Sequence, residues 1–532
     1  MDLLSWTFAD PDVQADKPIL IDAADPTRSL STAQLRSQVR RLIAGLQDTG
    51  IGPGDCVLVN AFNDVFYSVL YFGIMGCGGI FTGVNPAYKP AELAHHIALT
   101  QPKLIIAAPA LLPSTLAAAA QCGLPPSAVY QFDLAPSSTT PGVQSWTSLL
   151  APNERSWIIP ADPATAPAHY ASTSGTSGLP KAAILPHSYH VSQASFLSSS
   201  AATLPYTPIR LTALPPFHVF STPIVPSSIR SRIPTYIAPR LDIPSFIATV
   251  STHGITETYL APPTIVALGA NTAATSGTLR SLRQVWFGGA QLARPNREPL
   301  LRALHPNAAI QPVWGMTEAG WVTAGRLADT PDDSVGCVLP GYTVRVASDG
   351  ELLVRGPALM LGYLRNEEAS AAAWGDGWLR TGDVGREEGG KVWVVDRAKD
   401  LLKVRAWQVS PAEVEGVILA HPGVADAAVV GVELGDGSGE VPRAYVVRAA
   451  GGGGVSAEEV RQWTGERLAR YKVPEEVVFV DCIPKNPTGK VLRRVLREEA
   501  KNERPKTEGE AVVVMEVTET QSRVGARHTY SG

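Results

Sequence analysis

The sequence predicts an α/β fold in which mostly parallel sheets are covered by helices. From residue 1 to about residue 165, stretches with helical periodicity alternate with short apolar runs, and this order is typical of parallel sheets. The chain has 532 residues, of which 45% are hydrophobic and 18% are charged. This length and composition predict a globular protein of more than one domain with a large buried core.

The predicted elements follow one another closely in the N-terminal part. Residues 31–49 are predicted to form an amphipathic helix, residues 55–59 a buried strand, residues 90–99 a second helix and residues 103–107 a second strand. Residues 111–165 are rich in Ala, Ser and Pro, which predicts surface connections.

Residues 65–84 are apolar and uncharged, and are long enough to span a bilayer. Five glycines interrupt this segment, and Asn85 and Pro86 end it. Because the glycines gather where a turn would lie, we favour a buried helix followed by a buried strand, and we expect no membrane span.

The charge and the cysteines argue against several classes of protein. The net charge is -4, whereas nonspecific nucleic-acid binding needs a basic face, so we expect no nucleic-acid partner. The five cysteines are scattered, odd in number and without metal spacing, which predicts reduced, buried thiols. The N-terminal residues lack the basic region and the long apolar core of a signal peptide, and we expect a cytoplasmic protein.

Two pairs of histidines are candidate metal ligands. His95 and His96 are neighbours on a predicted helix and point in different directions, which favours a surface role. His187 and His190 can share a helical face, but the sequence offers no third ligand nearby. We expect no zinc at either pair.

One stretch, residues 172–181, has the composition of a phosphate-binding loop: Ser-Thr-Ser-Gly-Thr-Ser-Gly-Leu-Pro-Lys. Glycines let a backbone approach a ligand, successive N–H groups bind anions, and a lysine adds a point charge suited to phosphate. A flexible linker is the alternative, although linkers rarely run through Leu-Pro-Lys into an apolar stretch. The spacing fits neither a Walker A loop nor a nucleophile elbow.

This loop resembles the phosphate-binding signature of the acyl-adenylate-forming enzymes. They include acyl-CoA synthetases, 4-coumarate–CoA ligases, luciferases and the adenylation domains of peptide synthetases. Ala182 stands where the family usually has a glycine. The resemblance implies that ATP is held by Thr173, Ser174, Gly175, Thr176, Ser177, Gly178 and Lys181.

The resemblance also implies a domain organisation. An N-terminal adenylation (AMP-binding) domain would cover residues 1–395 and include a small barrel-like part beside the parallel sheets. A small mobile α+β domain would cover residues 396–500, with a hinge near Lys399, and residues 501–532 would form a polar tail.

Two further motifs follow in family order. Residues 214–220 contain Pro-Pro-Phe-His, and the resemblance implies that His218 lies against the carboxylate end of the acyl site, in a catalytic role. Residues 285–290 resemble the strand and turn that pass the adenine, which implies contacts at Gly289 and Ala290.

Residues 311–318 end in Trp-Gly-Met-Thr-Glu, similar to the family pattern Tyr-Gly-x-Thr-Glu. The resemblance implies that Trp314 stacks on adenine and that Thr317, a catalytic residue, donates to the α-phosphate. A magnesium ion on ATP needs carboxylate and phosphate oxygens, and Glu318 is the implied metal ligand.

The remaining nucleotide contacts lie nearer the C-terminus. Asp383, in Arg-Thr-Gly-Asp, can accept hydrogen bonds from both ribose hydroxyls. Residues 483–490 end in Pro-Thr-Gly-Lys, and the resemblance makes Lys490 the catalytic lysine. It also implies that three residues at the domain boundary approach the nucleotide: Arg397, Lys399 and Lys403.

The implied acyl pocket differs from that of many relatives. Val313 replaces the glycine of many hydroxycinnamate-activating enzymes, which argues against 4-coumarate, and Trp286 is either a pocket residue or a core residue. The full expected pocket is Phe220, Ile224, Trp286, Gly289, Val313 and Gln408. The implied CoA contacts are Arg240, Arg405 and Ala406, where the extra methyl of Ala406 in place of glycine narrows the path.

The resemblance implies an acid–thiol ligase that uses ATP, Mg²⁺ and CoA. It would convert a small-molecule carboxylate into acyl-AMP with release of pyrophosphate and then transfer the acyl group to CoA. The alternative is a stand-alone adenylating enzyme that loads a carrier protein. Light emission and nucleotide binding without turnover are more remote alternatives.

Overall fold

The computed structural model describes most of the chain. The described residues are 1–9, 15–133, 140–173, 180–290, 292, 294–327, 332–398, 400–404, 407–433, 440–449, 454–486 and 489–503, with only the backbone of Lys403, Trp407 and Gln408.

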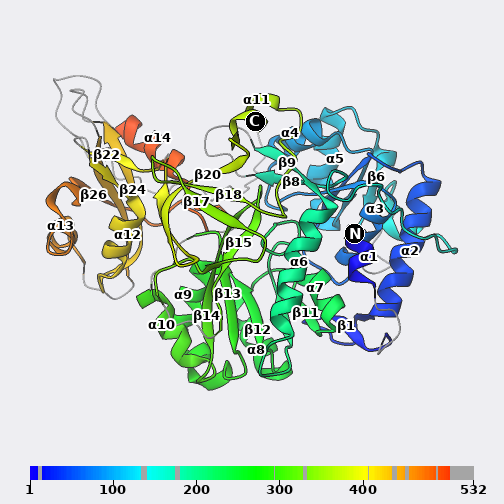
Figure 1. The fold of residues 1–532 in the computed structure, drawn as a ribbon, viewed down its shortest axis with the longest axis horizontal. Helices are drawn as coiled ribbons and strands as arrows, with labels where there is room; N and C mark the ends of the chain where they lie inside the picture. The colour runs from blue at the N-terminus through cyan, green and yellow to red at the C-terminus, as the bar shows by residue number, and fades with distance from the viewer. Residues whose placement is uncertain are drawn as a thin grey trace, which may run out of the picture.

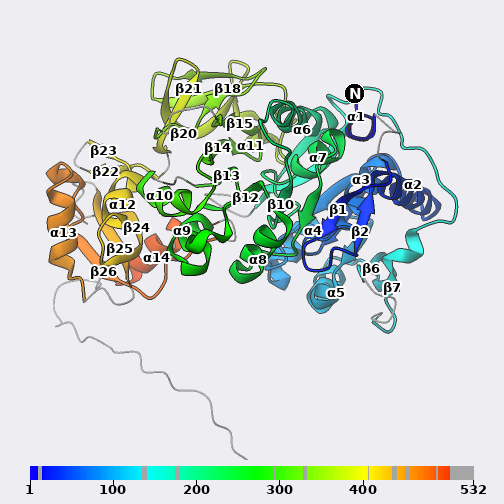
Figure 2. The ribbon, with the colours of Figure 1, turned by 90° about the horizontal axis from the view of Figure 1, so that it is seen from below.

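The N-terminal part is a seven-stranded sheet with helices on both faces (Figures 1 and 2). In sheet order its strands are β7 (Gln144–Ser145), β6 (Val129–Gln131), β5 (Leu104–Ala107), β3 (Cys56–Asn60), β4 (Ile80–Gly83), β8 (Pro167–Thr173) and β9 (Lys181–Pro186). All neighbours are parallel except β8 and β9. The helices are α1 (Leu3–Thr7), α2 (Thr32–Asp48), α3 (Tyr67–Gly76), α4 (Pro90–Thr100) and α5 (Leu112–Gln121).

Successive strand residues face opposite helices, as the pleat of a strand requires. Val57 and Val59 join the cluster with α2 and α3, whereas Leu58 joins the cluster with α4 and α5. The helix α2 begins with a capping box between Ser31 and Gln34, which satisfies otherwise unpaired N–H groups.

The prediction for residues 65–84 is confirmed, because they form the buried helix α3 and the buried strand β4. None of the helices in the described ranges has both the length and the apolar character to cross a bilayer. The prediction of surface connections over residues 111–165 holds for residues 152–165, which form no helix or strand and are not buried, but it is wrong for α5 and β6. Ala118 and Ala119 of α5 are buried, since small side chains let an alanine-rich helix pack closely, and β6 is an inner strand only three residues long.

A second sheet forms the middle of the molecule. Six of its strands are parallel neighbours: β1 (Pro18–Asp22), β11 (Thr235–Ile237), β10 (Arg210–Thr212), β12 (Glu257–Leu260), β13 (Gln284–Gly288) and β14 (Ala309–Met316). The antiparallel strand β2 (Ser29–Ser31) lies beyond β1, and β15 (Gly320–Ala324) lies beyond β14. The helices of this part are α6 (His187–Ala201), α7 (Ile224–Ser231), α8 (Ile243–His253), α9 (Pro262–Ala270) and α10 (Arg294–Ala303).

An antiparallel group extends the second sheet past β15, where the resemblance implied a small barrel-like part. It contains β16 (Cys337–Val338), β17 (Thr343–Val346), β18 (Glu351–Arg355), β19 (Trp374–Gly375), β20 (Trp378–Glu388), β21 (Lys391–Arg397) and the helix α11 (Glu367–Ala372). Short helical turns occur elsewhere at η1 (Pro109–Leu111), η2 (Pro126–Ala128), η4 (Trp146–Leu149), η5 (Ala274–Thr278) and η6 (Arg470–Lys472).

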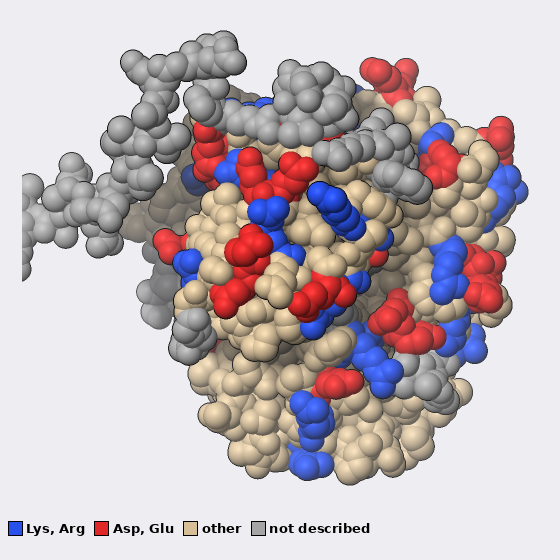
Figure 3. Space-filling view, turned by 90° about the vertical axis from the view of Figure 1, so that its left-hand side faces the viewer, with Lys and Arg blue, Asp and Glu red and all other residues tan. Residues whose placement is uncertain are grey.

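The C-terminal part has its own small sheets and its own core, seen at the left of Figures 1 and 2. It contains β22 (Leu402–Val404), β23 (Trp407–Val409), α12 (Pro411–Leu419), β24 (Val424–Glu433), β25 (Glu440–Arg448), α13 (Ala457–Gly465), β26 (Glu476–Phe479) and α14 (Arg493–Glu503). Basic and acidic side chains intermingle on the face shown in Figure 3. The α/β fold with a large N-terminal part and a small C-terminal part is confirmed, while the domain boundary at residue 395 stays a prediction.

Candidate active site

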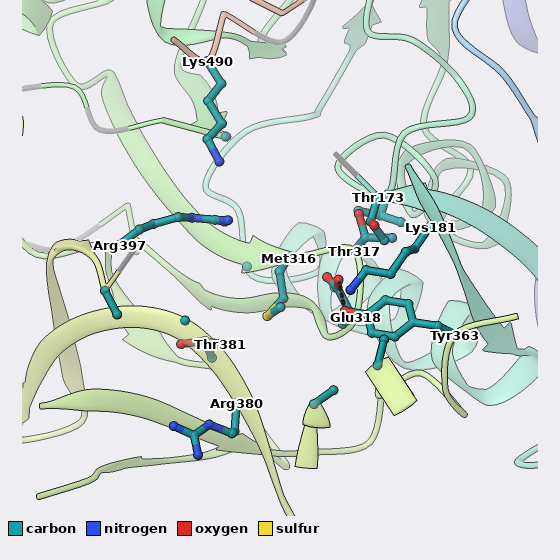
Figure 4. A pocket seen from close by; sticks show the side chains of 18 of the residues that line it. Thr173, Lys181, Met316, Thr317, Glu318, Tyr363, Arg380, Thr381, Arg397 and Lys490 are labelled. Atoms are coloured by element: carbon teal, nitrogen blue, oxygen red, sulfur yellow. Dashed lines mark hydrogen bonds between the residues drawn. The ribbon is translucent and has the colours of Figure 1, made fainter. Parts of the chain in front are cut away.

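A cavity of about 1000 Å³ lies where the second sheet, the antiparallel group and the C-terminal part meet. The parallel strands β13 and β14 end at its wall, with Gly288 and Gly289 on one and Met316 on the other. Ligands of α/β proteins usually bind at the carboxyl ends of parallel strands. Figure 4 shows Lys490 and Arg397 on one side of the cavity and Lys181 on the other.

Most of the described residues that the motifs predicted as site residues line this cavity, although they come from segments far apart in the chain. The predicted site residues on its wall are Thr173, Lys181, His218, Phe220, Gly289, Val313, Thr317, Glu318, Arg397 and Lys490. Three of them, Lys181, Arg397 and Lys490, are cations, and a cavity with cations on two sides suits a polyphosphate.

Lys490 reaches the cavity from the loop before α14. Its backbone N–H donates to Oδ1 of Asn486 at 2.8 Å. Burial and the nearby positive charge of Arg397 lower the pKa of Lys490 to about 8, against the opposite effect of Asp400 and Asp383. A bound phosphate would favour the protonated form again, because an opposite charge raises the pKa of an ammonium group.

Glu318 and Lys181 are linked through Tyr363. The Tyr363 hydroxyl donates to Oε1 of Glu318 at 2.7 Å, and Nζ of Lys181 lies 4.2 Å from the centroid of the Tyr363 ring. Burial and the negative charge of Glu318 raise the pKa of Tyr363, so the hydroxyl stays a donor. Sequence reasoning missed Tyr363 as a site residue, although residues 362–366, Gly-Tyr-Leu-Arg-Asn, lie between the predicted motifs at Glu318 and Asp383.

Asp383 is held by two donors. Nε1 of Trp314 donates to its Oδ2 at 2.8 Å, and Nε of Arg397 lies 3.1 Å from its Oδ1. The strand register explains the second contact, because Asp383 of β20 pairs directly with Arg397 of β21. Burial raises the pKa of Asp383, while Arg397 and Trp314 act in the opposite direction. The indole N–H of Trp314 is therefore hydrogen-bonded to Asp383, the residue predicted to bind the ribose.

His218 lies on the cavity wall as a neutral imidazole. The backbone N–H of Phe220 donates to Nδ1 of His218 at 3.2 Å, so the ring proton resides on Nε2. Burial lowers the pKa of His218 to about 4. At neutral pH this ring can donate one hydrogen bond from Nε2 without carrying charge.

The acyl side of the cavity differs from the prediction at two positions. Trp286 is 3% exposed and packs against Trp321, with ring centroids 5.8 Å apart. Ile224 lines a separate cavity of about 30 Å³. The structure therefore places Trp286 and Ile224 off the wall of the large cavity, and Trp321 on it. Trp321 was missed, although it comes three residues after Glu318 in the motif region.

Two histidines expected at the surface, His95 and His96, instead contact the residues on either side of the predicted phosphate loop. Nε2 of His95 lies 3.1 Å from the carbonyl oxygen of Pro180. His96 is 3% exposed, and its ring nitrogens contact Thr82 at 2.9 Å and Ser172 at 3.1 Å. The expectation of a surface role is wrong for His96, because its side of α4 packs on the sheet.

Other predicted residues lie away from the cavity or outside the described part. Arg240 and Ala290 are exposed and do not line the cavity. Among the described side chains, no three of His, Cys, Asp or Glu gather as metal ligands. The predictions that fall outside the described residues or side chains concern Ser174, Gly175, Thr176, Ser177, Gly178, Lys399, Lys403, Arg405, Ala406 and Gln408.

Comparison with known proteins places this geometry in a family. A family model described as AMP-binding enzyme matches residues 8–364, and one described as AMP-binding enzyme C-terminal domain matches residues 413–490. The chain is 37% identical to the phenylacetyl-CoA ligase epaB of Aspergillus niger, over 93% of this chain and 96% of that protein. It is also 37% identical to the nicotinic acid-CoA ligase olcI of Penicillium canescens, over 93% and 97%.

A solved structure shows the same overall arrangement. ATP-bound MatB from Rhodopseudomonas palustris superposes with a TM-score of 0.84 at 28% identity, covering 94% of this chain and 99% of that one. The matches in sequence and structure extend across both the N-terminal and the C-terminal parts. The chain therefore belongs to the AMP-binding enzyme family, the acyl-adenylate-forming enzymes that its motifs resemble.

Proposed function

We propose that this protein is an ATP-dependent, AMP-forming carboxylic acid–CoA ligase. A carboxylate oxygen attacks the α-phosphate of ATP, pyrophosphate leaves and acyl-AMP forms. The thiol sulfur of CoA then attacks the acyl carbon, AMP leaves and the thiol proton is released. One observation carries the proposal: Lys490, from the far end of the described chain, lines the same cavity as Lys181, Glu318 and His218.

The first step needs positioning and charge neutralisation more than covalent chemistry. Lys490 would neutralise charge between the carboxylate and the α-phosphate, where Thr317 would also donate. Lys181 would contact the outer phosphates, and Asp383 would accept from the ribose hydroxyls. His218 would orient the carboxylate by hydrogen bonding without protonating it, because its pKa of about 4 keeps the ring neutral.

Glu318 fits the magnesium ion that accompanies ATP. Mg²⁺ usually takes one or two carboxylates together with phosphate oxygens and waters, and Tyr363 fixes this carboxylate at the cavity wall. When bound, the ion would neutralise phosphate charge during attack and departure. Glu318 would hold the ion, and Tyr363 would hold Glu318.

CoA is the proposed acceptor because curated relatives such as epaB and the acyl-CoA ligase azaF are named as CoA ligases. In this proposal Arg240, Arg405 and Ala406 lie on the CoA path. Rotation near Lys399 would withdraw Lys490 and admit the thiol. A carrier-protein thiol is the alternative acceptor. A cytoplasmic location and a domain boundary after residue 395 belong to the same proposal.

The test separates the two half-reactions. Wild-type protein should catalyse ATP–pyrophosphate exchange with members of a panel of fatty, benzoic and cinnamic acids, and mass spectrometry should then detect acyl-CoA. Acyl-AMP without acyl-CoA would favour the carrier-protein alternative. No exchange with any acid would reject the ligase.

The Lys490→Ala variant tests the role of the lysine. It should reduce exchange by on the order of 10²–10³-fold, the usual cost of losing one group that stabilises transition-state charge. Thioester formation from supplied acyl-AMP should remain. Equal loss of both half-reactions would contradict a role for Lys490 confined to adenylation.

A further inference from the structure

A buried carboxylate, that of Asp396, joins the antiparallel group to the C-terminal part. We propose that Asp396 is a positioning residue, which holds the C-terminal part in the orientation that keeps Lys490 in the cavity. It acts through helix α12 and through the ion pair between Glu415 and Arg493. The inference rests on the proposed function, since adenylation is the half-reaction that would need Lys490 in place.

The backbone of Asp396 belongs to the antiparallel group. Asp396 lies in β21 and pairs with Val384 of β20, directly beside the pair formed by Asp383 and Arg397. The backbone N–H of Arg397 donates to Oδ1 of Asp396 at 2.7 Å. Val384 and Arg397 both line the cavity, so the strand pairing fixes the Asp396 carboxylate relative to the cavity wall.

The side chain of Asp396 reaches the first turn of α12, which packs on β21. Its Oδ2 accepts from Oγ of Ser410 at 2.6 Å and from the backbone N–H of Ala412 at 3.1 Å. Oγ of Ser410 also lies 3.1 Å from the backbone oxygen of Val395, but its contact with Asp396 is the shorter one. Asp396 is 8% exposed and Ser410 is 3% exposed. The helix dipole favours a carboxylate at this end of α12, and the bonds are charge-assisted.

An ion pair connects α12 with the loop that carries Lys490. Nη2 of Arg493 donates to Oε2 of Glu415 at 2.9 Å, and the backbone N–H of Val429 donates to Oε1 of Glu415 at 2.7 Å. The side chains of Glu415 and Arg493 are 12% and 13% exposed. Because Arg493 follows Lys490 by three residues, α12 and the Lys490 loop move together.

The bonds of Asp396 to α12 belong to one orientation of the C-terminal part. In the sequence, the predicted hinge at Lys399 lies between Asp396 and Ser410. A rotation there that withdraws Lys490 also moves α12 relative to β21, so the Asp396 carboxylate loses its two donors in α12. These bonds then stabilise only the orientation with Lys490 in the cavity. Bonds that merely capped α12 would instead affect both half-reactions alike.

The rate at which acetic anhydride acetylates Lys490 reports the exposure of this lysine in the full-length protein, without an acid or ATP. In Asp396→Ala this rate should rise by roughly tenfold or more, because losing hydrogen bonds to a charged group shifts an equilibrium by about 10–100-fold. Lys485 donates to Asp426 within the C-terminal part at 2.6 Å, so it should react at its wild-type rate. Mass spectrometry of the two modified lysines would measure both rates.

Two further variants control for loss of structure. Asp396→Asn keeps one oxygen as an acceptor for α12, so its effect should be intermediate. Asp332→Ala removes a carboxylate that accepts from Nζ of Lys391 in β21 at 2.7 Å, away from the C-terminal part, and Lys490 should then react at its wild-type rate. An unchanged Lys490 rate in folded Asp396→Ala, or equal rises at Lys490 and Lys485, would overturn the inference.

Kinetics separate the inference from the proposed function. With the acid of the panel that gives the fastest exchange, Asp396→Ala should lower kcat for exchange by about tenfold, because the competent orientation becomes the minor one. Thioester formation from supplied acyl-AMP should not slow. Equal slowing of both half-reactions would keep the ligase and reject the inference. Faster acetylation of Lys490 in Asp396→Ala, without exchange for any acid, would reject the ligase and keep the inference.

Discussion

Lys490 lies in the cavity, where a catalytic cation is needed, but the same surroundings disfavour its charged form. Its position in the cavity lets it reach the reacting phosphate, but burial and the charge of Arg397 lower its pKa to about 8 in the protein without ATP. The pH dependence of kcat/KM reports the pKa values of the free enzyme. The protonated fraction of Lys490 should therefore be visible in the kinetics.

Adenylation should lose kcat/KM as the pH rises through about 8. The ammonium form is the active one, and it predominates below the pKa and disappears above it, so the alkaline limb falls about tenfold per pH unit. ATP–pyrophosphate exchange between pH 6 and 10 would measure this limb. In Lys490→Arg, whose charge persists over that range, the same limb should disappear from the residual activity. A limb that is unchanged in the arginine variant would assign it to another group.

At the scale of an element, α4 positions both ends of the predicted phosphate loop. Thr82 donates its hydroxyl proton to the oxygen of Tyr170, so it must accept from Nε2 of His96. Nδ1 of His96 is then free to accept from Ser172, at the end of β8. His95 donates to Pro180, just before β9. One helix thus contacts the chain before and after residues 174–179.

Substitution of the two histidines should have different effects. His96→Ala removes the hydrogen bonds that the buried His96 ring makes to Thr82 and Ser172, which should lower the free energy of unfolding by about 1–3 kcal/mol. His95→Ala removes a half-buried contact, so it should raise the KM for ATP several-fold and leave the KM for the acid and the melting temperature nearly unchanged. Chemical denaturation and exchange kinetics would measure these effects. Equal changes in both KM values would indicate general loss of structure.

At the scale of the whole molecule, the C-terminal part approaches α9 closely at Gly489. Gly489 has a φ of 83°, and a Cβ there would lie 2.7 Å from Cγ of Pro263. Lys490 is the next residue, so this approach accompanies its entry into the cavity. A side chain at residue 489 would oppose this arrangement by contact and by backbone strain.

Gly489→Ala should slow adenylation by about tenfold or more and spare thioester formation from supplied acyl-AMP, because only the first half-reaction needs Lys490 in the cavity. Gly454→Ala is the control for a positive φ, since nothing lies within 4 Å of a Cβ at that glycine. Pro263→Ala in the same chain should recover part of the lost exchange. Loss of both half-reactions in Gly489→Ala would contradict the expected separation.

The sequence by itself determined the fold class, the family and the ten predicted residues on the cavity wall, about a third of the residues that line it. The periodicity of α2 and the apolar runs of β3 and β5 needed only local information. The motifs around Lys181, Glu318 and Lys490 could be recognised in the sequence because the functional groups of each motif lie within a few consecutive residues. Glycine, hydroxyl, carboxylate and lysine at fixed spacing indicate a nucleotide site before any packing is known.

Only the tertiary structure decided which neighbours these residues meet. Local composition could not show that alanines of α5 are buried or that His96 faces the sheet, because burial depends on distant segments. Trp286 and Trp321 look alike in the sequence, yet only Trp321 lines the cavity. Chain folding brings the positive charge of Arg397 near Lys490, and that charge helps to lower the pKa of Lys490. Contacts between strands and between the N-terminal and C-terminal parts join residues that are distant in the chain, so a local sequence pattern cannot predict them.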